Sequence, residues 1–172
     1  PRSNNDTDIS SGIIKELEKI SYSKYGRNEE KDIAMRVIAD HLRAVCFAIA
    51  DGQLPSNNGA GYVIRRILRR AVRYAYSFLK IKKPFLGNLF EILTNKMSSD
   101  FEELVTNKQL VKSVVKEEEI SFLRTLDQGL VMFNSLTSQS KDNIISGTKA
   151  FELYDTFGFP FDLTKIIAKE KG

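Results

Sequence analysis

Arginine is concentrated in the segment 61–76, Gly-Tyr-Val-Ile-Arg-Arg-Ile-Leu-Arg-Arg-Ala-Val-Arg-Tyr-Ala-Tyr. On an α-helix, at about 100° per residue, five arginines fall within about 140° of arc, and apolar residues fill the rest. They are Arg65, Arg66, Arg69, Arg70 and Arg73. No Asp or Glu interrupts the segment. This favours a surface for a polyanion, because a guanidinium binds phosphate with two parallel hydrogen bonds. The alternative is a solvated basic face whose acidic partners lie elsewhere in the chain.

Asp155 is a second candidate for binding. It lies in Leu-Tyr-Asp-Thr-Phe-Gly-Phe-Pro, near the end of a predicted helix. A carboxylate there faces the negative end of the helix dipole, which costs about a few tenths of a kcal/mol. Either a nearby arginine neutralises it, or it accepts a hydrogen bond from a ligand.

The remaining reactive groups give little support for catalysis. The single cysteine excludes an intrachain disulfide, and one His with one Cys excludes a zinc site of four such ligands. Apolar neighbours predict a small buried thiol at Cys46 and a core histidine at His41, and Glu117–Glu119 is typical of a solvated acidic face. Neither GxxxxGK[ST] nor GxGxxG occurs. The sequence therefore indicates a binding module, and the lone cysteine fits a reducing cytosol.

Composition agrees with a folded globular domain. The chain has 172 residues, of which 42% are hydrophobic and 28% charged, and its net charge is +4. No apolar run is long enough to span a membrane, and the polar start lacks the hydrophobic core of a signal peptide. Because the chain begins with Pro1, we expect a fragment of a longer protein.

Hydrophobic spacing predicts helices nearly throughout, and hence an all-α, bundle-like fold with one long helix and one Arg-rich helix. The Arg-rich helix is expected to be capped by Ser56 or Asn57 and to end near Lys80. Other helices are expected from Ser10 to about Tyr25–Gly26, over Lys31–Ala50, after Pro84, from Thr148 to about Phe157–Gly158, and after Pro160 or Asp162. The long helix, 109–136, would span roughly 40 Å. Its expected inward residues are Leu110, Val114, Phe122, Leu126, Leu130 and Phe133.

Several strings of residues resemble the alanyl-tRNA synthetase family. They are Asp40–Arg43, Ala50–Gly52, Pro55–Asn57, Gly61–Arg73, Glu117–Glu119 with Phe122, and Leu153–Pro160. Their order and spacing match the family from about Asp6 onward. The resemblance implies a helical tRNA-recognition region that follows the class II catalytic core, as one domain over 1–172 with a C-terminal subregion at 141–172.

The resemblance also implies which residues meet the RNA. Asn57 and Asp155 match the family's Asn and Asp that flank the guanine–uracil wobble at the third base pair of the acceptor stem, with Asn58 as the alternative to Asn57. The five arginines match the contact to the acceptor-stem backbone. A carboxylate suits the unpaired guanine 2-amino group in the wide minor groove of A-form RNA, and an amide suits a mixed edge.

The implied partners are the acceptor stem of tRNA(Ala) and the parent enzyme's catalytic and editing domains, without a membrane. The parent would be a cytoplasmic class II ligase that attaches alanine to its tRNA using ATP. No catalytic residue or metal site is expected in this segment, which alone should be inactive, whereas ATP, Mg²⁺ and Zn²⁺ would serve the parent. The alternative is a helical nucleic-acid or protein-interaction domain with an unrelated partner.

Overall fold

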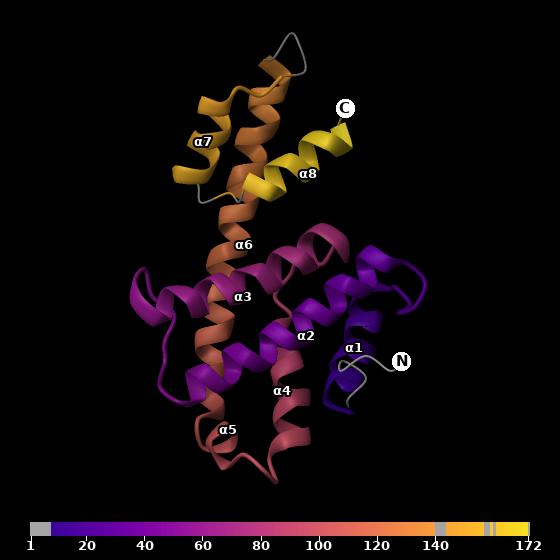
Figure 1. Ribbon diagram of the computed structural model, residues 1–172, viewed down its shortest axis with the longest axis vertical. Helices are drawn as coiled ribbons and strands as arrows, with labels where there is room; N and C mark the ends of the chain where they lie inside the picture. The colour runs from indigo at the N-terminus through magenta and orange to yellow at the C-terminus, as the bar shows by residue number, and fades with distance from the viewer. Residues whose placement is uncertain (1–7, 140–143, 157–158, 160, 172) are drawn as a thin grey trace. The chain divides into compact units, whose positions relative to one another are not determined.

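The computed structural model describes residues 8–139, 144–156, 159 and 161–171, which form eight helices and no strand, so the all-α prediction is confirmed (Figure 1). The helices are α1 Asp8–Ser21, α2 Glu29–Ala50, α3 Gly59–Phe78, α4 Leu86–Met97, α5 Glu102–Thr106, α6 Lys108–Gln139, α7 Gly147–Asp155 and α8 Phe161–Lys171.

The chain divides into two compact units, Pro1–Ile120 and Ser121–Gly172, and α6 contributes residues to both. The division lies within the long helix rather than at residue 141. A single recognition domain with a subregion at 141–172 stays a prediction.

In the first unit, α2 and α3 run antiparallel side by side, and α1 packs against α2 and α4 (Figure 1). The start of α2 is fixed by Asn28, whose side chain accepts a hydrogen bond from the Lys31 amide. Cys46 is fully buried, which confirms the prediction of a small buried thiol. The largest fully buried side chains of this unit are Ile13, Leu17, Met35, Ile38, Leu42, Ile49, Leu68, Leu86 and Phe90.

The Arg-rich helix forms as predicted, and α3 buries one apolar face. Its buried apolar residues are Ile64, Leu68, Ala71, Val72 and Ala75. The helix ends at Phe78, two residues before the predicted end. Lys80 adopts a left-handed conformation with φ 57°, which an α-helix cannot continue through.

The long helix α6 runs slightly further than predicted, and its buried stripe differs at the start. Leu110 is 44% exposed, whereas Val111 and Val115 are fully buried. Both Leu110–Val114 and Val111–Val115 have helical spacing, so periodicity alone could not choose between them. Further along, Phe122, Leu126 and Phe133 are buried as predicted.

The second unit is organised around Phe159, which is fully buried and donates its amide to the Leu153 carbonyl at 2.9 Å. A Cβ at Gly129 would lie 2.0 Å from Phe159 Cδ2, so only glycine allows this ring to pack on α6. The neighbouring Phe157, Gly158 and Pro160 lie outside the described residues.

Candidate nucleic-acid interface

The loop that carries Asn57 lies against the first turn of α3. The Ser56 hydroxyl donates to the Asn58 carbonyl at 2.6 Å, and the Ser56 amide donates to the Gly61 carbonyl at 3.0 Å. A Cβ at Gly61 would lie 2.3 Å from the Leu54 carbonyl oxygen, so this close approach requires glycine. The N-cap of α3 is Asn58, without a side-chain capping bond, and the prediction of Ser56 or Asn57 as the cap is wrong.

The exposed Asn57 side chain is held by an arginine of α3. Arg65 Nη1 donates a hydrogen bond to Asn57 Oδ1. The same guanidinium donates twice to Glu118 Oε1, from Nε at 3.1 Å and from Nη2 at 2.5 Å. Since Oδ1 accepts from Arg65, the amide NH₂ of Asn57 is its group for donating to a ligand.

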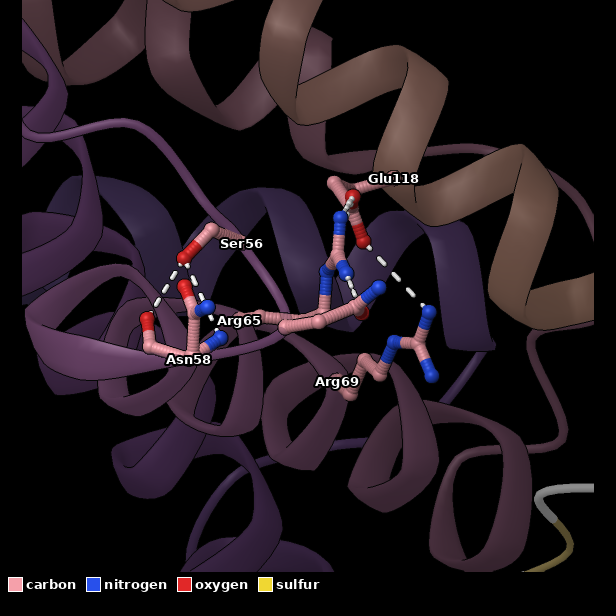
Figure 2. Close-up of polar contacts among 6 residues, drawn as sticks. Ser56, Asn58, Arg65, Arg69 and Glu118 are labelled. Atoms are coloured by element: carbon pink, nitrogen blue, oxygen red, sulfur yellow. Dashed lines mark hydrogen bonds and ion pairs between the residues drawn. The ribbon is translucent and has the colours of Figure 1, made fainter.

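Glu118 joins two arginines of α3 to α6 (Figure 2). Its other oxygen, Oε2, lies 3.6 Å from Arg69 Nη2. The Glu118 side chain is only 14% exposed, and those of Arg65 and Arg69 are 21% and 31% exposed. Burial lowers the pKa of the Arg69 guanidinium, and the nearby Glu118 carboxylate opposes that change. Two of the five arginines thus share one acidic partner.

The prediction of a solvated acidic face at Glu117–Glu119 is wrong for two of its three residues. Only Glu117 is exposed. Glu119 is fully buried and accepts hydrogen bonds from the Phe85 amide at 2.9 Å and the Leu86 amide at 3.2 Å, at the start of α4. Burial raises the pKa of Glu119 to about 7, although these N–H donors favour the charged form. Side chains at consecutive positions of a helix point in different directions, so Glu117 faces solvent, Glu118 faces α3 and Glu119 is buried against the start of α4.

Another part of α3 presents arginines beside tyrosine rings. Arg66 and Arg70 are exposed, and their Cζ atoms lie 5.7 Å from the Tyr62 ring centroid and 5.5 Å from the Tyr74 centroid. Arg73 lies 5.3 Å from the Tyr74 centroid, and burial lowers its pKa. These distances are those of cation–π contacts, which orient the guanidinium groups while leaving N–H donors for a ligand.

Asp155 is the last residue of α7 and is exposed. Among residues 8–139, 144–156, 159 and 161–171, no cation forms an ion pair with it. The role of Asp155 in ligand binding stays a prediction. Asn57 belongs to the first unit and Asp155 to the second, so their joint recognition of one base pair stays a prediction.

His41 differs from a fully buried core histidine, because its side chain is 18% exposed and its Nδ1 lies 3.4 Å from Asp40 Oδ2. Partial burial lowers its pKa, and the hydrogen bond with Asp40 opposes that change.

Two general features bear on function. In the part of the chain that the structure describes, His, Cys, Asp and Glu side chains form no group of three suited to a metal ion. Of the helices over these described ranges, none is both long and apolar enough to cross a membrane.

Comparison with known proteins gives one consistent result. The family model described as tRNA synthetases class II (A) matches residues 1–172. The chain is 59% identical over 171 residues to the alanine–tRNA ligase of Christiangramia forsetii, covering 99% of this chain and 20% of the relative. It is 54% identical over 179 residues to that of Flavobacterium psychrophilum, and 53% identical over 173 residues to that of Bacteroides fragilis, with the same coverage. The chain thus spans 20% of the length of these curated relatives.

The matching model describes the class II synthetase domain, and all of the chain falls within the match. The prediction of a tRNA-recognition region that follows the class II catalytic core is therefore wrong, because the chain lies within the class II synthetase domain. With its full length matched, this chain belongs to the family of class II (A) tRNA synthetases.

Proposed function

We propose that the chain is the part of an alanine–tRNA ligase that binds the acceptor stem of tRNA(Ala). The observation that carries the proposal is the basic surface of α3, where Arg66 and Arg70 are exposed beside tyrosine rings. No acid in α3 offsets them. The relatives that match over 99% of the chain are alanine–tRNA ligases, which supports a tRNA partner.

Arg66 and Arg70 supply most of the contact to RNA phosphates, because they are exposed and α3 carries no compensating charge. Arg73 adds to it from a partly buried position beside Tyr74. Arg65 and Arg69 contribute less to affinity because Glu118 partly neutralises them. This contact carries no sequence information, because every stem has the same phosphate backbone.

Asn57 and Asp155 recognise the base edges of the wobble pair and so give the binding its sequence specificity. Both side chains are exposed and polar, as that role requires. In a wobble pair the guanine 2-amino group has no partner base and faces the minor groove, where an ionised carboxylate such as Asp155 can accept its hydrogen bond. The Asn57 amide is held by Arg65 and presents its NH₂ group.

The parent protein is a cytoplasmic enzyme that joins alanine to its tRNA with ATP, and this segment belongs to its class II synthetase domain. ATP, Mg²⁺ and Zn²⁺ belong to the parent in this proposal. The isolated segment should neither activate alanine nor charge tRNA, and pyrophosphate exchange by the pure chain would contradict that.

Binding to an acceptor-stem minihelix tests the proposal. The chain should bind a minihelix with the wobble at the third base pair more tightly than one with a Watson–Crick pair there. Asp155→Asn should reduce that preference about tenfold or more, because the lost hydrogen bond is charge-assisted. Asp127→Asn, an equal charge change at another exposed position of the second unit, is the control. Lack of binding to any stem would favour the alternative, a helical domain with an unrelated partner.

A further inference from the structure

We infer that Glu118 is a positioning residue for base-pair recognition, because it orients Arg65 and Arg65 in turn orients the Asn57 amide. The inference rests on the proposed function, in which Asn57 meets the wobble pair. It assigns a role in specificity to an acid of α6 that is linked to Asn57 through Arg65.

The geometry forms a chain of three side chains. Glu118 Oε1 accepts two hydrogen bonds from Arg65, at 3.1 Å from Nε and 2.5 Å from Nη2. The remaining terminal nitrogen, Nη1, donates to Asn57 Oδ1. Because the guanidinium is planar and rigid, fixing two of its nitrogens also fixes the direction of the third.

Burial makes this anchor effective. The side chain of Glu118 is 14% exposed and that of Arg65 is 21% exposed, so solvent screens their ion pair less than an exposed one. Arg69 Nη2 lies 3.6 Å from Oε2, and this ion pair adds a second attraction between Glu118 and α3. Glu117, one position earlier, is exposed and has no such partner among the described residues.

The loop by itself does not orient the amide. Ser56 and Gly61 hold the backbone around Asn57 against α3. Within the described residues, Arg65 supplies the side-chain hydrogen bond of Asn57. An amide held before the RNA arrives loses less conformational entropy on binding, which favours the pair whose edge it fits.

Two consequences separate positioning from general support of the fold. Removing the Glu118 charge frees the Asn57 amide, so discrimination between base pairs falls. The same change makes the α3 surface more positive, so affinity for any stem stays equal or rises. A variant that only damages the fold would lose both.

The test uses the full-length synthetase that contains this segment. The measured quantity is kcat/KM for charging a tRNA with the wobble pair and a tRNA with a Watson–Crick pair at that position. Glu118→Ala should lower the ratio of the two values about two- to tenfold, the range for one neutral hydrogen bond to the RNA. Glu118→Gln keeps an acceptor for Arg65 and should retain part of the ratio. Glu117→Gln, with the same charge change at an exposed position, should leave it unchanged.

A double-mutant cycle with Asn57→Ala completes the test. Once Asn57 is Ala, adding Glu118→Ala should not reduce the ratio further, because both act through one amide. Independent, additive losses would overturn the inference, as would equal losses on both tRNAs or a Glu118→Gln variant as poor as Glu118→Ala. If Asn57→Ala lowers the ratio and Glu118→Ala does not, the inference alone fails. If Asn57→Ala leaves the ratio unchanged, the role of Asn57 in the proposed function fails as well.

Discussion

Four arginines of α3 form two pairs with different surroundings. The clamped pair, Arg65 and Arg69, is partly buried around Glu118. The open pair, Arg66 and Arg70, is exposed beside Tyr62 and Tyr74. The pairs are offset by one residue along one helix, which rotates them by about 100° and gives one pair a protein partner and the other solvent. All four side chains carry the same charge, and the side of α3 on which each lies determines whether it pairs with Glu118 or faces solvent.

The two pairs suit different parts of RNA recognition. An exposed guanidinium gives affinity that depends on salt and not on sequence. Arg65 of the clamped pair donates from Nε, Nη1 and Nη2 to Glu118 and Asn57, so it can fix the orientation of a neighbour. We therefore expect the open pair to determine the affinity for any acceptor stem. We expect Arg65, through Asn57, to contribute to the preference for the wobble pair over a Watson–Crick pair.

The acids of α6 repeat the contrast. Glu118 lies between two guanidinium groups, whereas Glu119 is buried with only the Phe85 and Leu86 amides as described donors. Burial raises the pKa of Glu119 to about 7 from an ordinary value of 4.5. A buried acid without a cation partner binds its proton more tightly after folding.

The largest predicted effect follows from Glu119. Since the pKa of Glu119 is higher in the folded chain, its contribution to stability is fully present below pH 4.5 and is lost as the pH rises towards 7. The fall should be roughly 3 kcal/mol in the free energy of unfolding. Glu119→Gln keeps an acceptor for the two amides and should remove this part of the pH dependence. Urea unfolding of both proteins between pH 4.5 and 8 measures the difference, and parallel curves would contradict it.

The second effect separates the pairs by stability. Arg65→Ala leaves Glu118 partly buried without its nearest cation and should cost about 2 kcal/mol, less than a fully buried pair because both groups keep some exposure. Arg66→Ala, the matched change in the open pair, should cost at most about 0.5 kcal/mol. Urea midpoints of the two variants measure this. Equal losses would mean that Glu118 does not distinguish the pairs.

Local pattern was enough to predict much of the fold. The apolar spacing of 31–50 and 61–76 has one helical solution, and both helices formed. The short helix α5, Glu102–Thr106, was not predicted because a single turn has too few residues to show a period. In the first turns of α6, the predicted buried positions are wrong by one residue, because the stripes Leu110–Val114 and Val111–Val115 both have helical spacing.

The sequence was enough to select the residues of the candidate site, but it could not predict which of them interact with each other or with Glu118. The arginines, Asn57 and Asp155 could be selected from charge, spacing and resemblance. Glu118 could not, because it is 53 residues from Arg65 in sequence and only tertiary packing brings them together. The only indication of such a partner in the sequence was the basic helix itself, because repulsion among its arginines favours an acidic residue from another part of the chain. Three consecutive glutamates did not show which one faced α3.

The third effect concerns salt. Replacing both Arg66 and Arg70 with Ala should weaken binding to wobble and Watson–Crick minihelices alike. It should also reduce the slope of log K against log salt by about 0.7 to 0.9 for each phosphate that the protein no longer neutralises. Replacing Arg69 and Arg70 together should have the same sign and a smaller slope change, because Arg69 is already paired with Glu118. Titrations over a range of salt concentrations measure the slopes, and unchanged slopes would place the open pair away from the RNA.

The smallest effect tests what the tyrosine rings add to the open pair. The Tyr74 ring lies 5.5 Å from Arg70 Cζ and 5.3 Å from Arg73 Cζ. An exposed cation–π contact contributes about 0.5 to 1 kcal/mol, so Tyr74→Leu should weaken stem binding by roughly two- to fivefold. Tyr74→Phe keeps the ring and removes the hydroxyl, which accepts a 3.5 Å hydrogen bond from Arg70 and also interacts with Arg73, and it should bind as the unchanged chain does. If Phe were as weak as Leu, the hydroxyl and not the ring would orient Arg70. If neither change affects binding, the rings do not prepare the open pair for RNA, and exposure alone distinguishes it from the clamped pair.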